Sequence, residues 1–228
     1  MYARWYRLRT DKALIFDFNG TLFWDSDYHR EAWSSVSVLY RGKPLSLSES
    51  YYLNGRTNAE TIAYILGYMP EKKELERLGE EKELLYRTIC IRNRPLRLAP
   101  GFLDLAARAK QLNIPMAIAT SAGKSNIEQY KKWFDLCNLI AEDLIIYDNG
   151  VRKSKPEPDI YLDACKALGI EPALCTVFED TKAGILSAKS AGIGTIWAVA
   201  SPGSDRETMQ AMEGVHGLID EFSQVKLQ

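Results

Sequence analysis

The chain has 228 residues and a formal net charge of −1, with 46% hydrophobic and 26% charged residues. These proportions are ordinary for a globular protein, and they exclude a disordered, collagen-like or coiled-coil chain. The near-neutral charge argues against a protein that binds nucleic acid or a membrane surface through a general electrostatic attraction. The length exceeds that of a common single domain, so we expect one domain that contains a large insertion.

The sequence contains no apolar run as long as a membrane span, and residues 1–9 lack the apolar stretch of a signal peptide. We therefore expect a soluble, cytoplasmic protein. The four cysteines include no closely spaced pair, and the chain has two histidines. These residues argue against a zinc site and against a Ser-His-Asp triad. We expect reduced, buried thiols and a chemistry that depends on carboxylates, lysine and hydroxyls.

The first predicted element is a short apolar strand at 13–18, which ends in the turn signal Asn19-Gly20. The next stretch, residues 25–94, is rich in helical patterns, with helices predicted at 29–40, 58–66 and 71–93. Because this stretch is far too long for a loop, we predict a helical domain inserted directly after the first strand.

From residue 95 onward, strand-length apolar runs alternate with segments of helical spacing. The predicted strands are 115–119, 144–147, 174–178 and 194–199, and the predicted helices are 102–112, 124–134, 160–168 and 183–191. This alternation is typical of βαβ units around a parallel sheet, and continuous apolar strands indicate a sheet covered on both faces. The predicted fold is α/β, with a Rossmann-like parallel sheet core at 1–24 and 95–228 and an inserted helical cap at 25–94.

Polar residues follow the predicted strands. They are Asp17, Thr120 with Ser121, Lys155, and Glu179 with Asp180. Parallel sheets bind ligands beyond the carboxyl ends of their strands, so we expect these side chains to converge at one edge. An acidic cluster suits Mg²⁺, while a lysine, a hydroxyl and backbone N–H groups can hold a phosphate. This combination favours phosphoryl transfer through an aspartyl-phosphate.

Four segments, in chain order, resemble the motifs of the haloacid dehalogenase superfamily, in the branch similar to β-phosphoglucomutase and its related phosphatases. They are Asp17-Phe18-Asn19-Gly20-Thr21, the hydroxyl residue Thr120 after a hydrophobic strand, Ser154-Lys155-Pro156-Glu157-Pro158-Asp159, and Glu179-Asp180-Thr181-Lys182-Ala183-Gly184. Any one of these motifs is weak, but the ordered set is specific and spans nearly the whole chain. The inserted helical stretch falls where this family carries its cap.

The resemblance implies a catalytic centre with a bound Mg²⁺ ion. Asp17 would be the nucleophile that accepts the phosphoryl group, and it would also be a metal ligand. The backbone carbonyl of Asn19 and the side chains of Glu179 and Asp180 would complete the metal site.

The resemblance also implies how the phosphate is held. Lys155 would bridge the nucleophile and the phosphate, and Thr120 would bind a phosphate oxygen. We also assign Ser121 to substrate binding, and Gly20 to a tight turn that lets the backbone approach the site.

Three residues of the predicted cap are candidates for substrate binding. His29 lies in a segment that resembles the hinge and first cap helix of β-phosphoglucomutase-like proteins. Arg56, within Asn54-Gly55-Arg56, resembles an arginine that binds substrate phosphate in these proteins, and Lys82 falls where they have a cap lysine. Closure of such a cap would exclude water, so open and closed states are expected.

Asn19 departs from the family pattern, because the mutases and phosphatases of this family place an aspartate there as general acid and base. An amide cannot donate and retrieve a proton, and loss of such help typically costs about 10² to 10⁴ in rate. Three interpretations follow: a slow or differently tuned hydrolase, a phosphate-binding protein without turnover, or a residue substituted to trap a complex.

The sequence therefore predicts a Mg²⁺-dependent hydrolase that removes phosphate from a small phosphorylated metabolite such as a sugar phosphate. The alternatives are a β-phosphoglucomutase-like isomerase and a catalytically impaired phosphate-binding protein. The loop that follows Thr120, Ser121-Ala122-Gly123-Lys124, lacks the Ser-Lys pair with which the mutases hold a second phosphate, so the phosphatase is favoured over the mutase. We expect a small phosphorylated metabolite as the binding partner and neither nucleic acid nor a membrane, and the sequence leaves protein partners unknown.

Overall fold

The computed structural model describes residues 6–8, 13–53 and 56–227. The rest of the segment 1–9, on which the signal-peptide expectation rests, and Asn54-Gly55 of the arginine motif lie outside the described residues. The chain divides into two compact units. The core unit comprises Met1–Trp24 and Arg97–Gln228, and the helical unit comprises Asp25–Leu96.

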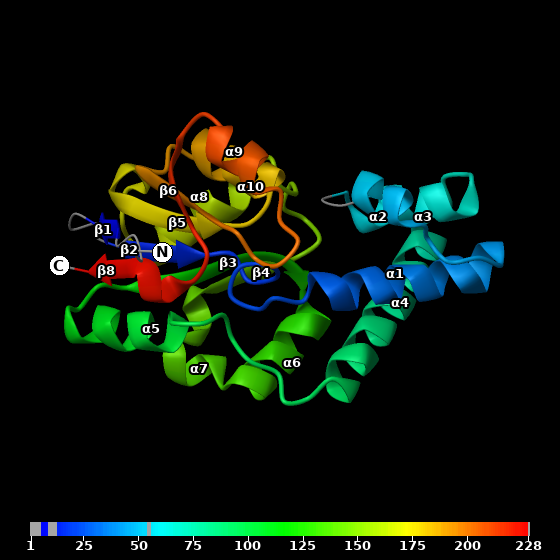
Figure 1. The fold of residues 1–228 in the computed structure, drawn as a ribbon, viewed down its shortest axis with the longest axis horizontal. Coiled ribbons are helices and arrows are strands. Elements are labelled where there is room, and N and C mark those ends of the chain that lie inside the picture. The colour runs from blue at the N-terminus through cyan, green and yellow to red at the C-terminus, as the bar shows by residue number, and fades with distance from the viewer. Residues whose placement is uncertain (1–5, 9–12, 54–55, 228) are drawn as a thin grey trace. The chain divides into compact units, whose positions relative to one another are not determined.

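A six-stranded parallel sheet forms the centre of the core unit (Figure 1). Its strand order is β4-β3-β2-β5-β6-β7. The bounds are β2 (Ala13–Phe16), β3 (Met116–Gly123), β4 (Ile145–Asp148), β5 (Cys175–Glu179), β6 (Thr195–Val199) and β7 (Val215–Ile219). Every pairing in this sheet is parallel, which confirms the predicted α/β class. A separate parallel pair joins β1 (Tyr6–Leu8) to β8 (Val225–Leu227).

Helices cover both faces of this sheet (Figure 1). One face carries α8 (Asp159–Leu168), α9 (Lys182–Ser190) and α10 (Arg206–Ala211). The other carries α5 (Phe102–Gln111), α6 (Lys124–Phe134) and the short α7 (Leu136–Leu139). Three 3₁₀ turns lie at Glu142–Leu144, Pro172–Leu174 and Phe222–Gln224. Burial on both faces explains why β2 is apolar along its whole length, with no alternation of polar residues, and why every residue of β5 is buried.

The strand side chains point alternately into two apolar layers. Ala13 and Ile15 belong to the layer that includes buried residues of α8 and α9. Phe16 points to the opposite layer, where its ring centroid lies 5.1 Å from that of Phe178 and 5.2 Å from that of Phe102. Phe222 closes this cluster from the last 3₁₀ turn, with its centroid 5.3 Å from Phe178. These four rings join β2, β5, α5 and the C-terminal segment into one core.

The described residues of the helical unit form four helices: α1 (Ser26–Arg41), α2 (Leu47–Leu53), α3 (Asn58–Leu66) and α4 (Lys72–Arg92). The chain ends α1 at Gly42, whose φ of 74° is the left-handed conformation that favours glycine. It begins α3 with a capping box, in which the Thr57 hydroxyl accepts from the Glu60 amide and the Glu60 carboxylate accepts from the Thr57 amide. Local sequence therefore specifies where these helices start and stop.

The predicted elements match the observed ones closely, with omissions at the edges. Strand β7 was not predicted, because the exposed His216 and the following glycine interrupt its apolar run. It also missed the short helices α2, α7 and α10. The expectation of buried, reduced thiols is correct for Cys90, Cys165 and Cys175, all free, but wrong about burial at Cys137, a free thiol that lies exposed after α6.

Among the helices of the described ranges, none has both the length and the apolar character to cross a lipid bilayer.

The phenylalanine cluster provides a test of the core. Phe222 is 1% exposed. Its replacement by alanine leaves a cavity among three other rings, so we expect Phe222→Ala to lower the free energy of unfolding by about 3 to 5 kcal/mol. The measurement is urea unfolding followed by circular dichroism. Leu103→Ala, on the exposed side of α5, should change the free energy by less than about 0.5 kcal/mol. Equal effects of the two substitutions would contradict this account of the core.

Candidate active site

The strand order reverses at the centre of the sheet. After β2 the chain builds β3 and β4 outward on one side, and it then returns to place β5 on the other side of β2. In open α/β sheets, ligands bind beyond the carboxyl ends of the strands at such a switch point. Asp17 directly follows β2, Glu179 ends β5, and Asp180 comes next. The topology therefore brings three carboxylates to the place where this fold binds ligands.

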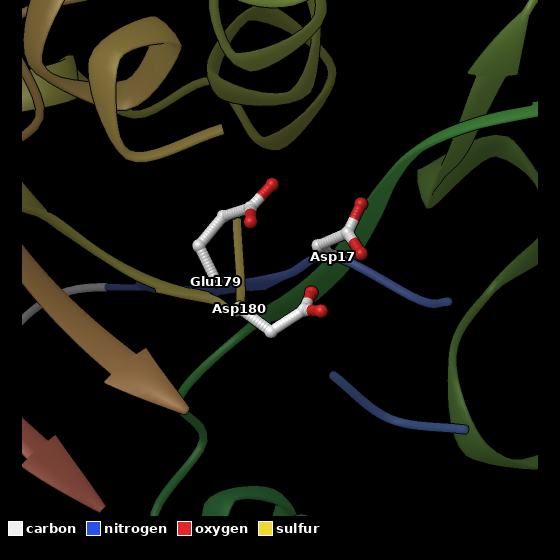
Figure 2. Close-up of side chains that lie close together, drawn as sticks. All are labelled: Asp17, Glu179 and Asp180. Carbon is white, nitrogen blue, oxygen red and sulfur yellow. The ribbon is translucent and has the colours of Figure 1, made fainter. Parts of the chain in front are cut away.

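The carboxylates of Asp17, Glu179 and Asp180 lie close together (Figure 2). Each offers one oxygen, and these three oxygens all lie within 4.8 Å of one another. Asp17 is 6% exposed and Glu179 is 1% exposed, so water screens their charges poorly. Within the described ranges, no other group of three or more acidic, histidine or cysteine side chains is close enough to share a metal ion.

Lys155 supplies the positive charge at this cluster. Its ammonium donates to Asp17 Oδ1 at 2.7 Å and to Glu179 Oε1 at 2.5 Å, and its side chain is 7% exposed. Burial alone would lower the pKa of this ammonium, but the neighbouring Asp17 and Glu179 carboxylates raise the pKa well above its ordinary value. Lys155 is therefore a fixed cation in this site rather than a proton donor.

The carboxylate of Asp180 lies in an electrostatically unfavourable environment. Burial raises the pKa of its carboxyl group well above the ordinary value, and the Glu179 and Asp17 carboxylates raise it further. The Thr21 hydroxyl, which donates to Asp180 Oδ1 at 2.8 Å, and Lys155 partly oppose this shift. Three carboxylates with one ammonium leave an excess of negative charge, and such a set of oxygen ligands fits a hard divalent cation.

Two glycines make room for the acidic side chains. A Cβ atom on Gly20, whose φ is +80°, would lie 2.0 Å from Asp180 Oδ2. A Cβ atom on Gly184, in the first turn of α9, would lie 1.6 Å from Glu179 Oε1. Contacts this short are impossible without displacement of the carboxylates. Gly20, expected to allow a close backbone approach to substrate, therefore also leaves space for Asp180.

Thr181 and Tyr161 hold Glu179 in place, and neither was singled out from the sequence. The backbone N–H and the hydroxyl of Thr181 donate to Glu179 Oε2 at 2.8 and 3.0 Å. The same hydroxyl accepts from the Gly184 amide and so caps the start of α9. Tyr161, on α8, donates from its hydroxyl to Glu179 Oε1 at 3.1 Å. The signal that could have found both is a hydroxyl at the N-terminal end of a helix that follows a motif: Thr181 after the acidic motif and Tyr161 after the lysine motif.

Asn19 lies between two buried hydroxyl groups. Its amide nitrogen donates to the Tyr130 hydroxyl at 2.8 Å, and its amide oxygen accepts from the Thr120 hydroxyl at 3.4 Å. Thr120 also accepts from the Ala122 amide at 3.1 Å, whereas the neighbouring Ser121 is exposed. The structure thus brings the predicted Asn19 and Thr120 together and adds Tyr130, which lies in the helix predicted at 124–134 and was not a predicted site residue.

The remaining predicted residues, His29, Arg56 and Lys82, belong to the helical unit. Lys82 is not a solvated charge, since it is 2% exposed and its ammonium lies 2.8 Å from His29 Nδ1 and 2.9 Å from Glu83 Oε1. The other nitrogen of His29, Nε2, lies 3.4 Å from Asp25 Oδ2. Arg56 is exposed; it donates to the Tyr52 carbonyl at 3.1 Å, and its guanidinium carbon lies 4.3 Å from the centre of the Tyr52 ring.

Comparison with known proteins places this geometry in a family. The model of haloacid dehalogenase-like hydrolases matches residues 12–192. A phosphorylated carbohydrates phosphatase from Thermotoga maritima is 29% identical over 202 residues, covering 87% of this chain and 89% of that protein. A β-phosphoglucomutase from Bacillus subtilis is 30% identical over 188 residues, covering 80% of each.

A solved structure agrees with this assignment. A haloacid dehalogenase-type hydrolase of family IA, variant 3, from Entamoeba histolytica aligns with a TM-score of 0.89 and 39% identity, covering 94% of this chain and 95% of that one. The matched residues include Asp17, Lys155, Glu179 and Asp180, which form the polar cluster at the sheet edge. With its parallel sheet, its acidic cluster and this match, the chain belongs to the haloacid dehalogenase-like hydrolases.

Proposed function

We propose that this hydrolase is a Mg²⁺-dependent phosphatase that acts on a small phosphorylated sugar through an aspartyl-phosphate on Asp17. The observation that supports it most directly is the contact of Lys155 with both Asp17 and Glu179, beside Asp180 and at the switch point of the sheet. The relatives support the substrate class, since one is named a phosphorylated carbohydrates phosphatase.

In this proposal Asp17 attacks the phosphorus atom, and the bond from phosphorus to the leaving oxygen breaks. Lys155 orients the attacking carboxylate through its 2.7 Å bond and neutralises charge on the transferring group. Thr120 binds a phosphate oxygen, with Ser121 and the backbone near Gly20 as further contacts. Water then attacks the phosphorus atom of the aspartyl-phosphate, which releases inorganic phosphate and restores the carboxylate.

The metal ligands in this proposal are Asp17, Glu179, Asp180 and the backbone carbonyl of Asn19. A bound Mg²⁺ would supply positive charge that stabilises the phosphoryl oxygens in the transition state. Mg²⁺ fits better than a softer metal, because the cluster offers carboxylate oxygens and neither thiolate nor imidazole.

The helical unit provides the proposed specificity residues. We assign substrate recognition to Arg56, His29 and Lys82, and we assign the helical unit as the cap. The exposed guanidinium of Arg56 suits a phosphate or an acidic group on the substrate. The buried ammonium of Lys82 lies 2.8 Å from Nδ1 of the half-buried His29, so each of these two side chains limits the positions open to the other.

The first functional test removes the nucleophile. Asp17→Asn keeps the shape of the side chain but cannot form an acyl phosphate, so we expect release of phosphate from sugar phosphates to fall to background. Chelation of divalent metal should abolish the activity reversibly. Asp104→Asn, on the exposed side of α5, is the matched control and should retain full activity. Turnover by Asp17→Asn, or in the presence of a chelator, would contradict the mechanism. Interconversion of hexose 1- and 6-phosphates with little phosphate release would instead identify a mutase.

The second test probes the support of Glu179. In Gly184→Ala the new methyl group would collide with Glu179 Oε1, so the carboxylate must move away from the cluster. We expect the affinity for Mg²⁺ to fall by about 10- to 100-fold, as for other groups that orient metal ligands. Isothermal titration calorimetry measures this affinity. Gly79→Ala, in α4, is the control, since its Cβ would approach no atom closer than Asn58 Nδ2 at 4.0 Å. Unchanged affinity in Gly184→Ala would show that Glu179 does not support the metal site.

A further inference from the structure

Asn19 is an ordered part of this site, because its amide is held by groups of the core. Tyr130, which accepts from the Asn19 amide nitrogen, is fully buried, and its ring packs on the buried Phe18 ring with centroids 4.6 Å apart and planes 22° apart. Thr120, which donates to the amide oxygen, is 1% exposed and lies in β3. The amide nitrogen and oxygen therefore each have a partner whose own position is set by packing.

An amide in this position changes which bonds the enzyme can break. When Asp17 attacks phosphorus, the leaving oxygen departs with the electron pair of the broken bond. The oxygen of an ordinary alcohol needs a proton at that moment, whereas a carboxylate or another weakly basic oxygen leaves as the anion. The Asn19 amide can donate a hydrogen bond to the leaving oxygen, but it has no proton to transfer.

The described side chains that could be considered as an alternative acid are already engaged in other contacts. The Lys155 ammonium donates to Asp17 and Glu179. Both ring nitrogens of His29 have partners in the helical unit, Asp25 and Lys82. The Tyr130 hydroxyl is fully buried and engaged with the Asn19 amide.

We propose that this hydrolase selects phosphorylated compounds whose leaving group departs without protonation. Acyl phosphates are the strongest members of this class, followed by phosphates on acidic hydroxyls such as the anomeric hydroxyl of a sugar. Phosphates of ordinary primary alcohols are poor substrates. Asn19 is the specificity-determining residue, and Tyr130 is the positioning residue that holds its amide. This inference rests on the proposed phosphatase function; among sugar phosphates it favours those on the anomeric hydroxyl, and it adds acyl phosphates to the substrate class.

The same feature affects the second half of the reaction. Release of phosphate requires water to attack the aspartyl-phosphate while its proton goes to a base, and the Asn19 amide is not a base. With an activated substrate the first step is therefore faster than the second. The phosphorylated form of Asp17 accumulates, and the first turnover appears as a burst of leaving group.

The experiment compares single-turnover rates of the full chain with Mg²⁺ on acetyl phosphate, a series of substituted phenyl phosphates and primary alkyl phosphates. The pKa of the leaving group then runs from about 4 for a carboxyl group to about 10 and above for phenols and alcohols. We expect the rate of the unmodified enzyme to fall steeply along this series. Intact mass spectrometry after acid quench should detect one added phosphoryl group with the activated substrates.

Three variants separate the roles. Asn19→Asp restores an acid of nearly the same volume, so rates on alkyl phosphates should rise by about 10² to 10⁴. Rates on acetyl phosphate should change little. The rate of this variant should therefore depend less steeply on the pKa of the leaving group. Tyr130→Phe keeps the ring packing and removes the hydroxyl that holds the Asn19 amide. All rates should fall, while the dependence of the rate on the pKa of the leaving group should stay steep. Asn149→Asp makes the same chemical change in an exposed loop and should reproduce the unmodified enzyme.

The outcomes are distinct. If the unmodified enzyme hydrolyses alkyl phosphates as fast as acetyl phosphate, its rate does not depend on the pKa of the leaving group. That result overturns the inference and leaves the phosphatase function intact. Absence of phosphoryl transfer to Asp17 from every compound, acetyl phosphate included, overturns the proposed function itself. The series on the unmodified enzyme decides the question even if a variant fails to fold.

Discussion

Mutual repulsion among the carboxylates of Asp17, Glu179 and Asp180 is the constraint that the other features of the site satisfy. Buried like charges are costly, and each acid is stabilised in a different way. Lys155 pairs with Asp17 and Glu179, the Thr21 hydroxyl donates to Asp180, and Thr181 donates twice to Glu179. Burial, together with the Glu179 and Asp17 carboxylates, still raises the pKa of Asp180 well above its ordinary value. Three carboxylates beside one ammonium form the kind of oxygen ligand set that suits a divalent cation.

The sheet supplies the rigidity that keeps these charges together. Phe16 of β2 pairs in register with Phe178 of β5, and the Asp17 amide donates to the Phe178 carbonyl at 3.0 Å. The next residues along the two strands, Asp17 and Glu179, are therefore neighbours by virtue of the ladder. The stacked rings of Phe16 and Phe178 hold the same two strands together on the face of the sheet that α5 covers. The acidic cluster and the core packing thus depend on the same pair of hydrogen-bonded strands.

The sequence predicts the α/β fold and the acidic cluster for related reasons. Apolar runs mark the buried strands, and the polar residues that end those runs must meet at one edge of a parallel sheet. Tyr130 could not be predicted in the same way, because helical periodicity shows that it is buried but not that its hydroxyl reaches Asn19. The steric role of Gly184 is equally hidden, since it depends on where the Glu179 side chain lies. Strand β7 could not be predicted from an apolar run, because it lies at the edge of the sheet and buries only its last two residues.

The central strand of the core is also the first strand of the sheet to leave the ribosome. β2 pairs Leu14 with Met116 and Ala13 with Cys175, so both of its neighbours are synthesised long after it. Sheets built from such distant pairings form slowly, and an apolar strand is prone to aggregate before its partner strands are available. The helical unit, whose contacts are local, can fold during that interval. Because that unit is inserted between β2 and the rest of the sheet, β2 has no sheet partner until β3 has been synthesised and lacks its second neighbour until β5 follows.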